Sequence, residues 1–252
     1  MRVAIRPVYY AGHMRATDEE IDIWWRIGLR TVGRLYWGAL RLRYAGLERI
    51  PRQGSAIFAM NHVSVLDPIA LALATASRGR AIRFLAGAEF FEHPVWGPGL
   101  RVTGQIPVWR GIRDLAALDE LIAELRRGGL AGIFPEGRIG AGTGRLRGRS
   151  GVTRVARAAG VPVIPVGLWG TQARWPLDGL KILPFRRLPV AASIGDPIQV
   201  RSTHDTTALR EDTRRIMTAI EGLVAKARAA VENAAPIPET APDAGLGRAG
   251  RS

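Results

Sequence analysis

The feature that most constrains the fold is an alternation of short apolar runs and helical patterns along residues 43–200. The apolar runs read as strands and span residues 56–60, 82–86, 105–108, 131–134, 163–168 and 190–194. Helical patterns span residues 68–77, 114–127 and 152–159, and a last one spans residues 207–231. Strands that alternate with helices predict an α/β fold, with a mixed sheet flanked by helices.

The segment before this region is predicted to form one amphipathic helix over residues 21–42. Trp24 and Trp25 contribute to its apolar side, and arginines recur every four residues at positions 26, 30 and 34. Aromatic rings combined with arginines are typical of a helix that lies in a membrane interface. The alternative is a surface helix that packs on the domain and keeps its arginines in solvent.

Three parts of the chain are therefore expected. They are an N-terminal segment with the interfacial helix (residues 1–42), a domain that ends in a C-terminal helix (43–232) and a tail (233–252). The tail is rich in Ala, Pro and Gly, and we expect it to be disordered because it cannot bury enough apolar surface to fold.

Composition narrows the chemistry and the partners. A net charge of +14 over 252 residues predicts an anionic partner: nucleic acid, a phosphorylated substrate or an anionic membrane surface. The chain has no cysteine, which excludes disulfides and thiolate chemistry, and any imidazole chemistry must use one of four histidines. Because no apolar run reaches the length of a membrane span, we expect a peripheral protein at the cytoplasmic face of the membrane.

The sequence NHVSVLD, at residues 61–67, joins a predicted strand to a predicted helix. Strand ends are where ligands bind in α/β sheets. A neutral imidazole at His62 can take a proton from a hydroxyl near neutral pH, and Asp67 can orient it and stabilise the imidazolium. Taken alone, this spacing favours a structural histidine in a turn, with Asp67 as a helix cap.

Two further strand ends carry charged side chains. In GQIPVWR, Arg110 follows a strand, where a guanidinium can hold a phosphate through two hydrogen bonds or simply lie in solvent. In FPEGR, Glu136 follows the next strand and can accept hydrogen bonds from the hydroxyls of a polyol. Between Glu136 and Asp178 the chain has seven arginines and no acidic residue, which favours a surface that attracts phosphate.

The last block, VPVIPVG at residues 161–167, reads as a buried strand. Prolines inside a strand favour an edge strand or a bulge. The residues of this block predict core packing and no chemistry of their own.

These four blocks resemble, in this order, the four motifs of the glycerolipid acyltransferase family. NHVSVLD resembles the family's histidine–four residues–aspartate motif, GQIPVWR the second motif, FPEG the third and VPVIPVG the fourth. The resemblance covers roughly residues 45–200, and four matches in order are far more specific than any one. It favours a catalytic His62 over a structural one.

The resemblance implies transfer of a fatty acyl group from acyl-CoA or acyl carrier protein to 1-acyl-glycerol-3-phosphate, giving phosphatidate without a cofactor or a metal. His62 would be the general base and Asp67 its orienting carboxylate. The implied substrate-binding residues are Arg110, Glu136, Gly137 and Arg138, and the implied supporting residues are Asn61 and Ser64. The fourth motif would help to shape the acyl pocket, and the implied partners are a lysophospholipid, the acyl thioester and an anionic membrane surface.

Two departures from the family pattern leave the acceptor open. Arg138 follows FPEG directly, where many members have Thr-Arg-Ser, and Trp109 stands where a small or acidic residue is common. The acceptor alternatives are another lysophospholipid, an acylated amino-acid lipid or a glycolipid. A basic nucleic-acid-binding protein is the remote alternative, but no nucleic-acid-binding motif is recognised, so no nucleic acid is expected as a partner.

Overall fold

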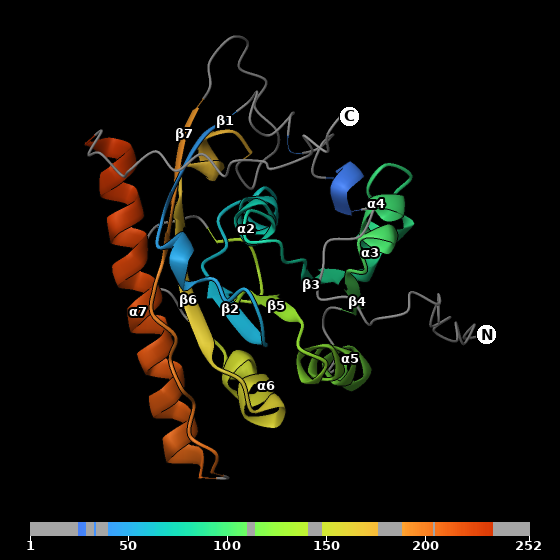
Figure 1. The fold of residues 1–252 in the computed structure, drawn as a ribbon, viewed down its shortest axis with the longest axis vertical. Coiled ribbons are helices and arrows are strands. Elements are labelled where there is room, and N and C mark those ends of the chain that lie inside the picture. The colour runs from blue at the N-terminus through green and yellow to red at the C-terminus, as the bar shows by residue number, and fades with distance from the viewer. Residues whose placement is uncertain are drawn as a thin grey trace, which may run out of the picture.

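A computed structural model of the protein describes residues 25–28, 33, 40–109, 114–140, 148–175, 188–203 and 205–233. Across these residues a seven-stranded sheet has the order β1-β7-β6-β2-β5-β3-β4 (Figure 1). The strands are β1 Leu40–Ala45, β2 Ala56–Met60, β3 Ile82–Gly87, β4 Ile106–Val108, β5 Leu130–Ile133, β6 Val163–Trp169 and β7 Leu188–Ile194. The helices are α2 Asp67–Ala76, α3 Ala88–Glu92, α4 Trp96–Val102, α5 Leu115–Arg126, α6 Gly151–Ala159 and α7 Thr206–Glu232, with the 3-10 helices η1 Leu47–Arg49 and η2 Thr171–Ala173.

The sheet is mixed, as the alternating pattern predicts. β2 pairs in parallel with β5 and β6, and β3 pairs in parallel with β4 and β5. β7 runs antiparallel to β6 and parallel to β1. Because the carboxyl ends of parallel strands meet at one edge, the residues that follow β2, β4, β5 and β6 share that edge, which is where α/β sheets bind ligands.

Both faces of the sheet are covered, as the side chains of β2 show. All five residues of β2 are buried, and successive side chains point to opposite faces. Phe58 and Met60 belong to the apolar cluster that contains α2, whereas Ile57 and Ala59 belong to the cluster that contains α5, α6 and α7. Figure 1 accordingly shows α2 on one side of the sheet and α5 and α6 on the other.

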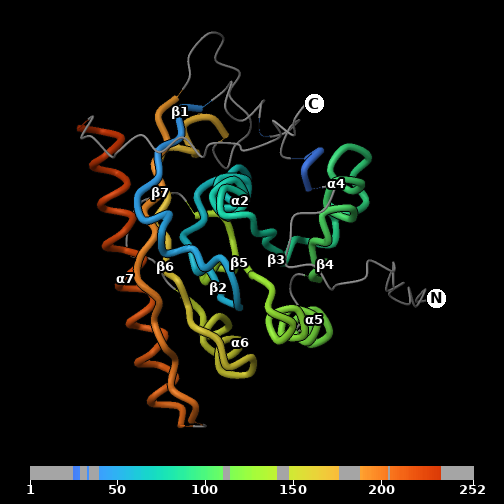
Figure 2. Tube along the Cα trace, viewed as in Figure 1, coloured from blue at the N-terminus to red at the C-terminus, as the bar shows by residue number. Residues whose placement is uncertain are grey.

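Helix α7 runs alongside β6 and β7 (Figure 2). It approaches β6 so closely that a Cβ atom at Gly167 would collide with the backbone of Leu223 and Val224. The helix begins after Asp205, whose carboxylate accepts the backbone N–H groups of Thr207 and Ala208 at 3.0 Å each. In the part of the chain that the structure describes, neither α7 nor any other helix is long and apolar enough to cross a membrane.

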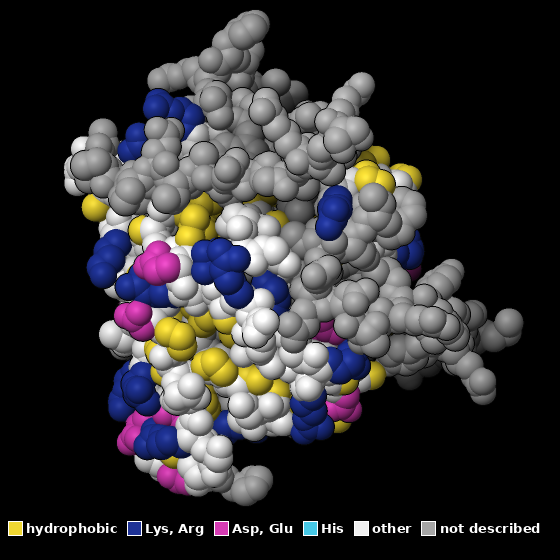
Figure 3. Space-filling view, viewed as in Figure 1, with side chains coloured by type: hydrophobic (Ala, Val, Ile, Leu, Met, Phe, Trp, Pro, Cys, Tyr) yellow, Lys and Arg dark blue, Asp and Glu magenta, His cyan; other side chains and the backbone are white. Residues whose placement is uncertain are grey.

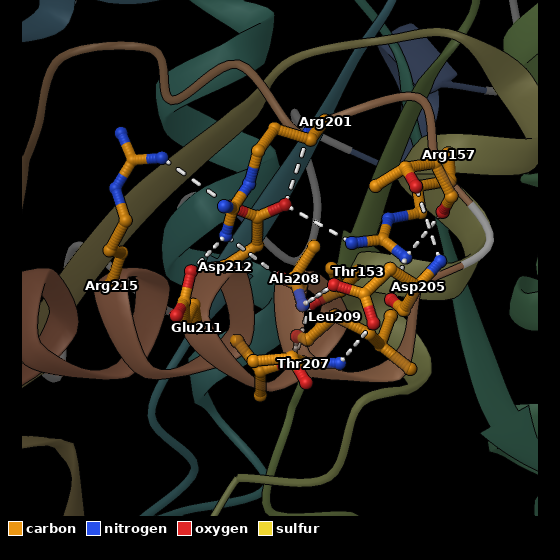
Figure 4. Close-up of polar contacts among 12 residues, drawn as sticks. Thr153, Arg157, Arg201, Asp205, Thr207, Ala208, Leu209, Glu211, Asp212 and Arg215 are labelled. Carbon is orange, nitrogen blue, oxygen red and sulfur yellow. Dashed lines mark hydrogen bonds and ion pairs between the residues drawn. The ribbon is translucent and has the colours of Figure 1, made fainter.

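A buried carboxylate fastens the first turns of α7 to the rest of the domain (Figure 4). Asp212 is fully buried and lies 3.0 Å from Nη2 of Arg201, 3.3 Å from Arg157 and 3.4 Å from Arg215. Its pKa is lowered, because the hydrogen bonds from Arg201 and Arg157 outweigh the opposing effect of burial. This cluster ties α7 to α6 and to the chain that precedes α7.

The predicted strands and helices after residue 43 are confirmed, with ends shifted by at most two residues. The predicted start of α5 illustrates the agreement, because the carboxylate of Asp114 accepts the backbone N–H of Ala117 and caps the helix. Helices α3 and α4 were not predicted. The sequence Gly97-Pro98-Gly99 interrupts the helical pattern there, since glycine and proline are poor helix formers.

The predicted helix over residues 21–42 is wrong at its C-terminal end, because residues 40–42 lie in β1 and pair with β7. Residues 25–28 are helical, and Trp25 is only 7% exposed, with its indole N–H donating to the Thr103 carbonyl at 3.1 Å. The packed alternative therefore applies at Trp25. Gly33 is also helical and buried, whereas the other residues of the predicted helix and the predicted tail beyond Asn233 lie outside the described residues.

Strand β6 pairs with β2 on one side and with β7 on the other, so the edge-strand alternative for VPVIPVG is wrong. The irregularity in this pairing lies in the opposing segment, and β6 itself contains no extra residue. Val163 pairs with Ile198 and Val166 with Ile194, so three steps along β6 correspond to four along the opposing segment. This one-residue shift lies beside Pro165, where a residue without a backbone N–H is tolerated.

Candidate active site

The turn between β2 and α2 brings His62 and Asp67 together. Nδ1 of His62 lies 3.0 Å from Oδ2 of Asp67. The same carboxylate oxygen accepts the backbone N–H groups of Val63 and Ser64 at 2.7 and 2.8 Å. The chain therefore folds back around the carboxylate, and the connection from strand to helix itself positions the imidazole.

Asp67 is fully buried, and its second oxygen, Oδ1, accepts the hydroxyl of Thr171 at 2.6 Å. Hydrogen-bond donors at both oxygens are what a buried carboxylate needs. A proton on Nδ1 of His62, facing the carboxylate, leaves the lone pair of the neutral imidazole on Nε2. Within the described residues Nε2 has no hydrogen-bond partner, and the His62 side chain is 13% exposed. This nitrogen can accept a proton from a molecule at the sheet edge.

The FPEG sequence after β5 encloses His62. The phenyl ring of Phe134 stacks on the imidazole, with ring centroids 3.9 Å apart and planes inclined by 22°. Oε1 of Glu136 accepts the backbone N–H of His62 at 3.0 Å, and the N–H of Gly140 donates to the His62 carbonyl at 2.7 Å. The third motif thus fixes both the ring and the backbone of His62.

Glu136 combines partial burial with an available oxygen. Burial raises its pKa, and the hydrogen bond from the backbone of His62 opposes this effect in part. Its other carboxylate oxygen has no partner among the described residues. Gly137 follows with φ 69°, a left-handed conformation that glycine adopts readily, and Arg138 is exposed beyond it. The two oxygens of Glu136 can therefore serve His62 and a ligand hydroxyl respectively.

The second motif is only partly placed. Arg110 lies outside the described residues, so its predicted contact with phosphate stays a prediction. Trp109 is 47% exposed, and its backbone N–H donates to the carboxylate of Asp114 at 3.1 Å. β5 and β3 separate β4 from β2 in the sheet. In the described part of the chain no group of three or more His, Asp or Glu side chains is arranged to hold a metal ion.

The two predicted supporting residues connect the turn to β6 and the segment after it. The Asn61 side chain exchanges two hydrogen bonds with the backbone of Leu168, at 2.8 and 2.9 Å. The Ser64 hydroxyl donates to the carbonyl of Trp175 at 2.7 Å. In the described residues β6 is buried core, as its own sequence predicts, and the shaping of an acyl pocket by the fourth motif stays a prediction.

Sequence reasoning missed three residues of this site: Phe134, Thr171 and Trp175. Phe134 is the first residue of FPEG, and no sequence pattern indicates that its ring stacks on an imidazole. Thr171 and Trp175 lie more than 100 residues from their partners. Contacts across such a separation depend on the sheet order, so no local pattern could have found them.

The part of the chain that carries this site is similar to known proteins. The sequence matches the Acyltransferase family over residues 41–169, just over half of the chain, a stretch that includes His62, Asp67 and Glu136. An uncharacterized protein of Mycobacterium tuberculosis is 30% identical over 178 residues, which cover 62% of this chain and 48% of that protein. The 1-acyl-sn-glycerol-3-phosphate acyltransferases of Borreliella burgdorferi and Brassica napus (chloroplastic) are each 30% identical over 55% of this chain, covering 55% and 40% of their own lengths.

The chain thus spans about half the length of the curated relatives it matches. Among solved structures, the 1-acyl-sn-glycerophosphate (LPA) acyltransferase PlsC of Thermotoga maritima has the same fold, with a TM-score of 0.58, 23% sequence identity and coverage of 79% of both chains. Since the family match extends over more than half of the sequence and includes the His62–Asp67 turn, the chain belongs to the Acyltransferase family.

Proposed function

We propose that this protein transfers a fatty acyl group from an acyl thioester to the free hydroxyl of 1-acyl-glycerol-3-phosphate, with His62 as the general base. The observation that carries the proposal is the 3.0 Å contact between Nδ1 of His62 and buried Asp67, at the carboxyl edge of the sheet. An imidazole whose tautomer is fixed by a carboxylate, and whose other nitrogen is open, is suited to deprotonate a hydroxyl.

In the proposed reaction, Nε2 of His62 takes the proton of the acceptor hydroxyl while the oxygen attacks the carbonyl carbon of the thioester. The tetrahedral intermediate collapses, the C–S bond breaks and the carbonyl re-forms. The departing thiolate takes the proton back from the imidazolium, so the products are an ester and a free thiol. Asp67 stabilises the transient imidazolium through the contact at Nδ1.

Glycerol phosphate is the acceptor head that best suits the candidate binding residues. The second carboxylate oxygen of Glu136 can accept a hydrogen bond from a glycerol hydroxyl. The exposed Arg138 can form an ion pair with the phosphate. Arg110 is proposed as a second phosphate contact. The names of the Borreliella and Brassica relatives support this acceptor. Acyl-CoA and acyl carrier protein are the proposed donors, and no cofactor is required.

A peripheral position on the cytoplasmic face of an anionic membrane is part of the proposal. Within the described residues, the exposed large apolar side chains are Ile27, Val95, Trp96, Trp109 and Leu115. Figure 3 shows hydrophobic side chains gathered in the region of α4. The ring of Trp96 contacts that of Trp175, with centroids 6.2 Å apart. The backbone carbonyl of Trp175 accepts the hydrogen bond from the Ser64 hydroxyl. An exposed apolar surface next to the site supports access to a lipid acceptor.

The test is acyl transfer by purified protein in detergent, with product identified by mass spectrometry. The acceptors are lysophosphatidate, other lysophospholipids, an acylated amino-acid lipid and a glycolipid, each offered with oleoyl-CoA and with an acyl carrier protein thioester. Formation of phosphatidate above all other products supports the proposal. Preferential acylation of another acceptor would replace the proposed substrate, and silence across the panel together with salt-dependent DNA binding would contradict the reaction class.

A further inference from the structure

The segment that follows the fourth motif, Leu168–Trp175, holds the His62–Asp67 turn at three points. The bonded pairs are Leu168 with Asn61, Thr171 with Asp67, and Trp175 with Ser64. All three residues of the turn come from the first motif, which lies more than 100 residues earlier in the chain. The segment therefore stabilises the turn. Each of the three contacts involves a different residue of the turn.

Thr171 alone among the three reaches the group that contacts the imidazole. Both Thr171 and Asp67 are fully buried, and the hydroxyl lies 2.6 Å from Oδ1, a short distance of the kind that hydroxyls make with charged carboxylates. His62 contacts the opposite oxygen, Oδ2. The two side-chain donors therefore hold the two ends of one carboxylate, and a rotation of that carboxylate would break both contacts.

The backbone places Thr171 at this position by a specific turn. Gly170 has φ 106° and precedes the short helix η2, which starts at Thr171. A Cβ atom at Gly170 would collide with the carbonyl of Pro189 in β7. The chain can leave β6 and turn back over Asp67 at this point because position 170 is a glycine.

We infer that Thr171 is a positioning residue for the proposed acyl transfer, acting through Asp67 on His62. This inference rests on the proposed role of His62 as the general base. The hydroxyl of Thr171 stabilises the negative charge on Oδ1 by a hydrogen bond. It also holds the carboxylate in the orientation in which Oδ2 contacts Nδ1 of His62. Without it, the described residues would hold Asp67 through Oδ2 alone, and the carboxylate would direct more of its charge toward a protonated imidazole.

The test compares Thr171→Val with Thr171→Ser in the full-length protein. Valine has nearly the same shape but no hydroxyl, whereas serine keeps the hydroxyl. Thr171→Val is expected to lower kcat roughly ten-fold, as expected for the loss of one hydrogen bond to a charged group, with the KM for the acyl thioester near the wild-type value. The acid limb of the kcat/KM profile is expected to move to higher pH, because the protonated imidazole is better stabilised. Thr171→Ser is expected to restore both properties.

Thr153→Val is the matched control. Thr153 in α6 is also fully buried, and its hydroxyl lies 2.8 Å from that of Thr213, on the opposite face of the sheet from α2. This variant loses a buried hydroxyl without touching Asp67, so it is expected to lower the Tm and leave the pH profile unchanged. A Thr171→Val protein that behaves like Thr153→Val, with a lower Tm and an unchanged pH profile, would overturn the inference.

A second readout separates this inference from the proposed function. The ¹⁵N–¹H signal of the His62 imidazole, assigned by its loss in His62→Ala, reports the contact with Asp67 in the protein without substrates. It is expected to shift in Thr171→Val and to return in Thr171→Ser. If the wild type acylates no acceptor, the proposed function fails, while an unchanged imidazole signal in Thr171→Val overturns the role of Thr171 by itself.

Discussion

Phe134 and His62 form a stacked pair, with ring centroids 3.9 Å apart and an interplanar angle of 22°. The ring of Phe84 in β3 also stacks with Phe134, with centroids 6.0 Å apart and planes inclined by 19°. The imidazole is thereby held by an aromatic face as well as by Asp67. The two constraints act in different directions, one on the plane of the ring and one on its rotation within that plane.

Phe134→Leu is expected to lower kcat several-fold, up to about ten-fold, since an aromatic pair contributes roughly 0.5–1.5 kcal/mol beyond its buried area. Leucine keeps apolar bulk against His62 but offers no flat face, so the imidazole samples more orientations. Steady-state kinetics with the full thioester assay measures the effect. Phe91→Leu, in α3, removes another buried phenyl ring and controls for general loss of packing; equal turnover in both variants would contradict the stacking role.

Replacement of Glu136 by Gln is expected to have a pH-dependent effect on stability. Burial raises the pKa of Glu136 from its ordinary value of 4.5, so the folded state binds this proton more tightly than the unfolded state does. The contribution of protonated Glu136 to stability is complete at a pH below its ordinary pKa. This contribution is lost as the pH rises through the raised pKa. The Tm of Glu136→Gln, relative to that of the wild type, should therefore increase as the pH rises from below 4.5 through the raised pKa of Glu136. A gap that stays constant or widens in favour of the wild type would contradict this account.

Substitution by alanine is expected to have opposite effects on stability at Gly167 and at Gly222. At Gly167 a Cβ atom would collide with the backbone of α7, whereas at Gly222, inside α7, it would meet nothing within 4 Å. Gly167→Ala is expected to cost about 1–3 kcal/mol or more, as overpacking does. Gly222→Ala is expected to stabilise the protein by up to about 1 kcal/mol, through helix propensity. Urea unfolding of both variants measures the two free energies, and a stable Gly167→Ala protein would show that α7 can move away from β6.

Asp212→Asn is expected to destabilise the protein by about 3 kcal/mol at neutral pH, because the charged hydrogen bonds at a buried carboxylate are lost and Arg157, whose side chain is 14% exposed, loses its counter-charge. The pKa of Asp212 is lowered from its ordinary value of 3.8 by the arginine contacts that outweigh burial. Its contribution is therefore present above that value and is lost as the pH falls through the lowered value. Thermal unfolding of both proteins should show the gap closing in acid. A gap that persists there would assign the effect to side-chain shape.

The fold was largely predictable because its central part has strong local signals. The apolar run of β2 and the periodic pattern of α5 were found with nearly their observed bounds. β1 was missed because Leu40 fits the apolar side of the helix predicted for the preceding segment, so the first residues of LRLRYA extend that helical pattern. Which of these two readings holds depends on pairing with β7, which is 148 residues away in the chain.

The site was predictable only where motifs supplied it. The spacing of His62 and Asp67 within one turn is local, and the structure brings them into contact. The motif predicts Glu136 as a ligand for the acceptor, but no sequence pattern indicates its hydrogen bond to the backbone of His62. Thr171 reaches Asp67 across 104 residues. A contact of that kind is set by the order of strands in the sheet, which the sequence pattern leaves undetermined.

The measurement that tests the central claim most directly is the rate of thiol release from oleoyl-CoA with lysophosphatidate, compared between the wild type, His62→Ala and His93→Ala. His93 is an exposed histidine that accepts the backbone N–H of Val95, outside the proposed site, so its loss controls for removal of an imidazole. The account predicts acceptor-dependent release that falls by about 100-fold or more in His62→Ala, with the Tm near that of the wild type, and that persists in His93→Ala. Undiminished release from a folded His62→Ala protein would contradict it.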